Sequence, residues 1–151
     1  MSINVNKEKI NFGSIYLTRA NKMGILNIVV VVDIFKDNNK YLLDSSSNVI
    51  AFNQNQFSDD FPNVFGDKAE NEFINFFNKL ENYNFPKKRV KNYYYFQIDR
   101  WDLQLFNEQI IKFPQDKIEE AIQQSVELLN RKDFNNYNVI DLRIHGKIVV
   151  E

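Results

Sequence analysis

Residues that could carry acid–base, nucleophilic or metal chemistry are sparse in this sequence. It contains one histidine, His145, and no cysteine, which argues against thiolate chemistry, disulfides and a multi-histidine metal site. Asp99, Asp102 and Asp141 lie beside apolar segments, but paired carboxylates do acid–base work only within a shared cleft, which spacing alone does not show. With four glycines and no phosphate-loop string, a nucleotide site is not indicated either. We therefore expect no enzyme activity, no catalytic, cofactor or metal site and no small-molecule substrate.

Two of these residues are predicted to face solvent. His145 precedes Gly146 between two apolar segments and is interpreted as an exposed turn residue. Asp102 alternates with Trp101 and Leu103, so on a strand it points away from the face that those two residues bury.

A basic and aromatic segment from Lys87 to Phe96 has the composition of a single-stranded nucleic-acid site, with cations beside stacking rings. On a strand, Tyr93 and Tyr95 share one face and Tyr94 and Phe96 the other, so one pair belongs to the core. The chain has 19 Lys plus Arg against 20 Asp plus Glu, a net charge of −1, which is not the basic balance of a nucleic-acid binder. Nucleic-acid binding by this segment is the alternative function; a solvated strand without a nucleic-acid partner is the main expectation.

The end of the sequence has the pattern of a short apolar strand, Ile148, Val149 and Val150, between Lys147 and Glu151. A terminal strand is often a sheet edge, whose unpaired N–H and C=O groups can pair with another chain. Proline, bulges and inward charges normally blunt such edges, and this segment has charges only at its ends. We expect an open edge that takes up a partner strand, the alternative being an edge too short to do so. Proline at Val149 is expected to remove one of its donors.

The elements that position these residues follow from apolar spacing. Phe73, Phe76, Phe77 and Leu80 lie at i, i+3, i+4 and i+7, which predicts an amphipathic helix capped by Asp67, and a second helix is predicted over residues 116–131, capped by Asp116. Strand patterns cover residues 13–19, 25–32, 40–43, 48–52, 91–98, 101–105, 109–113, 139–144 and 148–150. This order indicates an α+β fold, a mainly antiparallel sheet with two amphipathic helices packed on it.

Several segments, in order, resemble one protein family. The string Arg100-Trp101-Asp102-Leu103-Gln104-Leu105 with Ile110-Ile111-Lys112-Phe113-Pro114 resembles the R-W-D-L-x-L…i-x-L-P segment of the bacterial cell-division family FtsQ (DivIB), especially its alphaproteobacterial form. Residues 41–50, 61–69 and 139–150 are similar to further segments of that family, and together they cover nearly all of residues 34–151. Ser47 and Glu108 stand where the family usually has glycine.

The resemblance implies an FtsQ-type β domain over residues 34–151, preceded in residues 1–33 by the last two strands of a POTRA domain. It implies a non-enzymatic scaffold of the divisome in the bacterial cell cycle, on the periplasmic face of the inner membrane at the division septum. The longest apolar run, residues 28–32, is too short to span a membrane, so membrane association is expected only through an N-terminal anchor missing from this sequence.

The resemblance also implies partners and a site. The partners are the coiled-coil division proteins FtsB and FtsL, and FtsB adds a strand to the final strand of the β domain. Carried over position by position, the partner site comprises Arg143, Ile144, Ile148, Val149 and Val150. Arg100 matches a basic position close to that site.

Overall fold

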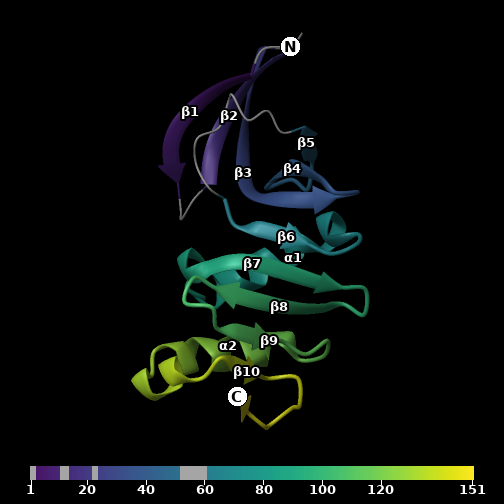
Figure 1. Ribbon diagram of the computed structural model, residues 1–151. Helices are drawn as coiled ribbons and strands as arrows, with labels where there is room; N and C mark the ends of the chain where they lie inside the picture. Colours follow the sequence, from purple (N-terminus) through teal and green to yellow (C-terminus); the bar gives the residue numbers. More distant parts are fainter. Residues whose placement is uncertain (1–2, 11–13, 22–23, 52–60) are drawn as a thin grey trace.

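One mainly antiparallel sheet runs through the molecule, from its first strand to its last (Figure 1). The computed structural model describes residues 3–10, 14–21, 24–51 and 61–151, with side chains for residues 32–51 and 61–151. Within these residues the sheet has 11 strands: β1 (Ile3–Ile10), β2 (Ser14–Asn21), β3 (Gly24–Lys36), β4 (Asn39–Asp44), β5 (Val49–Ala51), β6 (Asn63–Phe65), β7 (Val90–Phe96), β8 (Arg100–Leu105), β9 (Ile110–Lys112), β10 (Val139–Asp141) and β11 (Val149–Val150).

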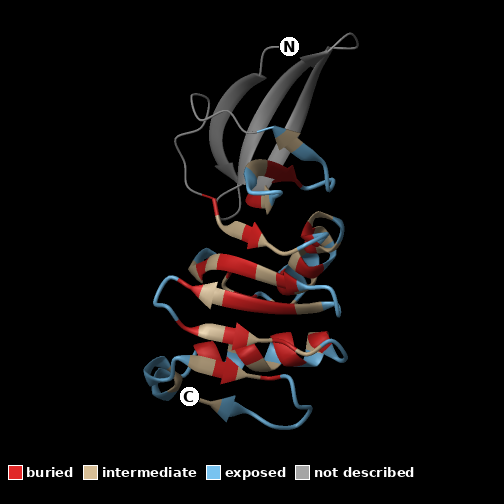
Figure 2. Cartoon of the chain, turned by 45° about the vertical axis from the view of Figure 1, so that its right-hand side comes forward, coloured by how far each residue is buried: buried red, intermediate tan, exposed pale blue. Residues whose placement is uncertain are grey.

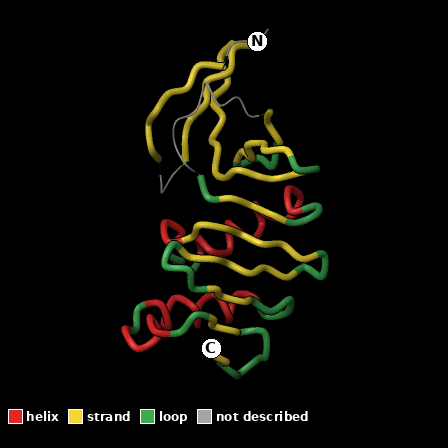
Figure 3. The backbone as a smooth tube through the Cα atoms, in the orientation of Figure 1, coloured by secondary structure: helices red, strands yellow, loops and turns green. Residues whose placement is uncertain are grey.

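The strand order is β1-β2-β3-β6-β7-β8-β9-β10-β11, with β4 and β5 branching from β3. Three pairs are parallel, β3 with β6, β6 with β7 and β9 with β10, and the others are antiparallel. Parallel neighbours need a crossover connection. Helix α1 (Ala69–Asn82) supplies it between β6 and β7, and helix α2 (Ile118–Leu129) supplies it between β9 and β10. Both helices lie on the same face of the sheet (Figure 3), which confirms the predicted α+β class.

The predicted strand segments fall on observed strands, some with shorter bounds. Short 3-10 turns, η1 (Lys87–Arg89) and η2 (Lys132–Asn136), lead into β7 and β10. Residues 52–60, which include the end of one predicted strand and a polar stretch, lie outside the described residues. Strand β3 runs through residue 33, where the sequence suggests a boundary between 1–33 and 34–151. That division into two domains stays a prediction.

An aromatic cluster between the sheet and α1 forms the centre of the core. Trp101 of β8 stacks on Phe76 with ring centroids 4.8 Å apart, and it contacts Phe73 and Tyr95 through tilted or edge geometries. The predicted helix stripe is therefore the buried face of α1. Much of β7 and β8 is buried (Figure 2). Trp101, Leu103 and Leu105 of β8 are buried toward the core, but Asp102 between them is buried as well, so burial does not simply alternate along the strand. Burial raises the pKa of the Tyr95 hydroxyl to about 12.

The predicted helix caps are wrong. The residues at the N-cap positions are Lys68 and Lys117, in left-handed conformations with φ of 62° and 55°, and neither makes a side-chain capping bond. Asp67 instead accepts a hydrogen bond from the Gln97 side chain, on the turn between β7 and β8. Acidic residues in the first turn of each helix still interact favourably with the positive end of its dipole.

Two turns adopt a conformation that suits glycine although glycine is absent. Ser47 and Glu108, the positions at which the FtsQ family usually has glycine, have φ of 66° and 71°. The left-handed conformation is unfavourable for residues with a Cβ. In the first turn Asp44 compensates, because its carboxylate accepts hydrogen bonds from the backbone of Ser46 and from Asn48.

Gly66 is the converse case, a glycine that cannot be replaced without conflict. It has φ of 124°, and a Cβ there would lie 2.3 Å from the carbonyl oxygen of Tyr95. Only glycine lets the loop before α1 approach β7 this closely.

These two positions give opposite predictions. Ser47→Gly should raise the free energy of unfolding by up to about 1 kcal/mol, because it removes left-handed strain without removing a side-chain contact described for Ser47. Gly66→Ala should lower it by roughly 1–3 kcal/mol or more, because it adds strain and a clash. Urea unfolding of both variants measures the difference; a neutral Gly66→Ala would contradict the packing described above.

Candidate functional site

Strand β11 lies at the end of the sheet and pairs only with β10 among the described strands (Figure 1). Strand β10 is itself enclosed, with β9 on its other side. The outer edge of β11 is therefore open in the described part of the chain, which is the arrangement the sequence suggests for its last strand.

The hydrogen-bond register shows which backbone groups face outward. Glu151 and Val139 exchange both hydrogen bonds, with N···O distances of 3.1 and 3.2 Å. Inward and outward groups alternate along an antiparallel strand, so Val149 also faces β10, while the N–H and C=O groups of Val150 and Ile148 point away from the sheet. The expectation that proline at Val149 removes an outward donor is thus wrong, since that N–H faces β10.

Exposed apolar side chains surround this edge. Ile144 is 56% exposed, Val149 43% and Ile148 39%, whereas Val150 is half-buried on the side of the buried Ile140. The connection from β10 to β11 is exposed as well (Figure 2). Apolar residues gathered beside an open edge are the kind of surface that another chain can cover.

Arg143 is held in place at the start of this connection. Its guanidinium makes a bidentate contact with Asp141, with Nη2 2.6 Å from Oδ2 and Nε 2.9 Å from Oδ1. The hydrogen bonds from Arg143 lower the pKa of the Asp141 carboxyl, which keeps the pair ionised. Asp141 also accepts the backbone N–H of Arg143, so the same carboxylate contacts both the backbone and the side chain of this arginine and holds it in one orientation.

Arg100 lies three strands away, on β8, rather than at the edge itself. It belongs to a charged row on the sheet face opposite the helices, in which Asp102 lies opposite Lys112 and Lys112 opposite Asp141. Its guanidinium lies over the Phe96 ring at 4.2 Å. The structure thus brings Arg143, Ile144, Ile148, Val149 and Val150 together at the β10–β11 connection and joins Arg100 to them only through this row.

Asp102 differs from its prediction. It does point away from the core face, but it is only 7% exposed, because the side chains of Tyr94, Arg100 and Lys112 flank it on the same face. Burial raises the pKa of Asp102, and Arg100 opposes that shift from an Nε–Oδ1 distance of 3.6 Å, too long for a hydrogen bond. His145, by contrast, is exposed, as predicted.

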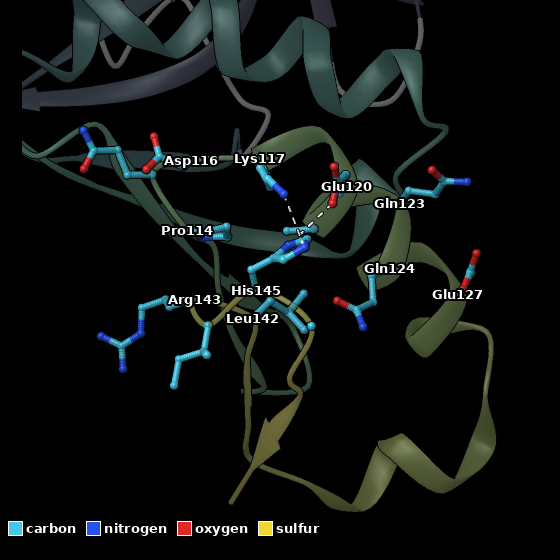
Figure 4. Close-up of a pocket in the computed structure, with 14 residues that line it drawn as sticks. Pro114, Asp116, Lys117, Glu120, Gln123, Gln124, Glu127, Leu142, Arg143 and His145 are labelled. Atoms are coloured by element: carbon cyan, nitrogen blue, oxygen red, sulfur yellow. Dashed lines mark hydrogen bonds and ion pairs between the residues drawn. The ribbon is translucent and has the colours of Figure 1, made fainter.

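A groove of about 730 Å³ lies between α2 and the β10–β11 connection (Figure 4). His145 bridges it: Nε2 lies 3.4 Å from Nζ of Lys117, and Nδ1 lies 3.5 Å from Oε2 of Glu120. Pro114 and Leu142 also line it. Sequence reasoning missed this groove, although polar residues at helical spacing on the outer face of α2 were a visible sign: Glu120, Gln123, Gln124 and Glu127.

The side chain of Gln109 fixes the position of β10 and therefore of the edge. This buried amide donates to the carbonyl oxygens of Phe134 and Tyr137, both at 2.7 Å, and the N–H of Ile110 donates to Asn138 at 2.8 Å. The chain that returns from α2 is thereby aligned beside β9.

The basic and aromatic segment is not built as a nucleic-acid surface. Tyr93 and Tyr95 are buried in the core, as the alternation predicts for one of the two pairs. Lys87 is buried against the Phe77 ring and pairs with Glu81 at 2.6 Å, and Lys91 pairs with a glutamate. The rings that would stack on bases and the cations that would contact phosphates are largely engaged within the fold.

In the described part of the chain, no cluster of three or more His, Cys, Asp or Glu side chains could bind a metal ion. No described helix has the length and apolar character needed to cross a bilayer.

Comparison with known proteins agrees with the resemblance seen in the sequence. The family described as cell division protein FtsQ/DivIB, C-terminal, matches residues 34–143, most of the 151-residue chain. The matched region begins with the end of β3, contains both helices and Arg100, and ends at Arg143, before β11. No curated protein matches the chain. On this evidence the chain belongs to the FtsQ/DivIB family of cell-division proteins, through its C-terminal domain.

Proposed function

We propose that this protein is a non-enzymatic recruitment scaffold of the bacterial divisome that binds a partner by adding the partner's strand to the outer edge of β11. Family membership supports the role in cell division. The observation that carries the mechanism is the open edge, at which the backbone groups of Val150 and Ile148 point away from β10.

The proposed partners are proteins of the FtsB and FtsL type, with the FtsB-type protein supplying the strand. The proposed place of action is the periplasmic face of the inner membrane at the septum, where an N-terminal anchor would hold the domain. The family supports both assignments, because its members are divisome proteins.

Three kinds of contact contribute to the proposed binding of a partner strand at this edge. The outward groups of β11 supply sequence-independent pairing, since each added strand needs only its own backbone to complete the ladder. The apolar side chains Ile144, Ile148 and Val149 supply area to bury, and the oriented guanidinium of Arg143 supplies charge. Affinity then comes mainly from the backbone and buried area, and selectivity from the side chains.

The contribution of backbone hydrogen bonds to partner binding can be tested at Val150. Val150→Pro removes an outward N–H and places a ring where the partner strand must pack, so binding of a soluble FtsB-type partner should weaken by at least about tenfold (~1.4 kcal/mol). Val150→Ala is the matched control, because it shortens the same side chain but keeps the donor. Isothermal titration calorimetry measures both variants, with circular dichroism to check the fold. Equal binding by the two variants would rule out strand addition at β11.

The side-chain term can be tested at Ile144. This residue is largely exposed in the free chain, so Ile144→Asp should leave folding intact and weaken the partner contact by on the order of 1.5–3 kcal/mol if the side chain becomes buried in the complex. Ser46→Asp, in the exposed turn between β4 and β5, controls for added negative charge. An unchanged affinity of Ile144→Asp would remove Ile144 from the interface.

A further inference from the structure

The edge at β11 lacks the features that usually prevent an edge strand from pairing with the same strand of a second copy. Edge strands are commonly guarded by proline, by bulges or by charges that repel a second strand. Here the segment from Lys147 to Glu151 has no proline, and its two charges are of opposite sign and equally spaced about Val149. Within the described residues, neither the Lys147 nor the Glu151 side chain makes an ion pair, and both are exposed.

An antiparallel twofold pairing centred on Val149 would give partners to the outward backbone groups of Ile148 and Val150 and to both charged side chains. Val149 would face Val149 of a second copy as a non-hydrogen-bonded pair, and Ile148 would exchange backbone hydrogen bonds with Val150 of that copy, because these are the residues whose groups point outward. Lys147 would then lie opposite Glu151 of the second copy, and the symmetry repeats this ion pair. In this register the two charges of the segment therefore attract those of the second copy.

We propose that two copies of this chain pair through their β11 edges in this register, and that the pairing masks the edge until a partner strand displaces it. This inference rests on the proposed function, since it makes self-pairing and partner binding compete for one set of backbone groups.

Only this register combines all the contacts. Shifting the second strand by two residues keeps outward groups opposite outward groups but leaves Lys147 opposite Val149, and a shift by one residue places inward groups opposite outward ones. The contact is short, so the dimer should be weak and exchange readily, as expected for an interface well below the area of stable complexes. A weak dimer is what a displaceable mask requires.

Single cysteines test the register, because the natural sequence has none. Val149→Cys should form a disulfide-linked dimer under mild oxidation at micromolar protein, since a non-hydrogen-bonded antiparallel pair brings its Cα atoms to about 4.5 Å. Ile148→Cys should not, because its equivalent lies diagonally across the twofold axis, beyond disulfide reach. Ser46→Cys, in the exposed turn after β4, gives the rate of random collision. Cross-linking of Val149→Cys no faster than Ser46→Cys, or faster linking at Ile148, would overturn the proposal.

Charge reversal tests the pairing without cysteine. Lys147→Glu places two glutamates opposite each other twice in the dimer, so the dimer dissociation constant measured by sedimentation at low salt should rise by about tenfold. The double variant Lys147→Glu/Glu151→Lys exchanges the two signs and should restore dimerisation. Its net charge equals that of the natural chain. A double variant as weak as the single one would overturn the ion-pair register.

Competition separates this inference from the proposed function. An excess of the FtsB-type partner should suppress cross-linking of Val149→Cys in proportion to its binding, which supports masking. If the partner binds but the Val149→Cys dimer never forms, the self-pairing proposal is wrong and the proposed recruitment function is still supported. If the dimer forms and the partner neither binds nor competes, the proposed recruitment at β11 is wrong, and so is the proposal that self-pairing masks the edge.

Discussion

The crossover from β9 to β10 decides which strand ends the sheet. A parallel pair cannot be closed by a tight turn, so α2 must carry the chain over the face and return it beside β9. The buried amide of Gln109 fixes that return by binding the carbonyl groups of Phe134 and Tyr137. Once β10 is fixed, β11 pairs with its outer side, and among the described strands none pairs with the outer side of β11. The proposed recruitment site is therefore a result of topology more than of any single surface side chain.

The periodic parts of the structure could be predicted from the sequence, because burial leaves a regular trace there. Phe73, Phe76 and Leu80 lie on the buried face of α1, and Trp101 and Leu103 alternate with polar residues on β8. The same regularity separates the buried Tyr93 and Tyr95 of β7 from the more exposed Tyr94 between them. An edge position for the last strand also followed from general principles, since terminal strands are often edges.

What could not be predicted depends on contacts between distant segments. Asp67 has the local pattern of a cap, yet a glutamine thirty residues away binds it, and the backbone at Lys68 turns left-handed instead. Asp102 alternates like a solvent-facing residue, but neighbouring strands cover it. The direction of each backbone group on β11 depends on its register with β10, which spacing along one strand cannot supply. The groove beside His145 likewise exists only once α2 is placed.

The two faces of β11 differ in chemistry, and this has a consequence for any strand that docks there. Val149 continues the charged row of Lys112 and Asp141 on one face, while Ile148 and Val150 continue the apolar side that holds the helices. Alternate residues of an incoming strand would point to opposite faces of the sheet. Those on the face of the charged row could be polar, and those on the face that carries the helices would have to be apolar. A sequence with the right composition but the opposite phase would place every side chain on the wrong face. Under the proposed strand addition, the edge would therefore discriminate between candidate ligands by the order of their residues as well as by their kind.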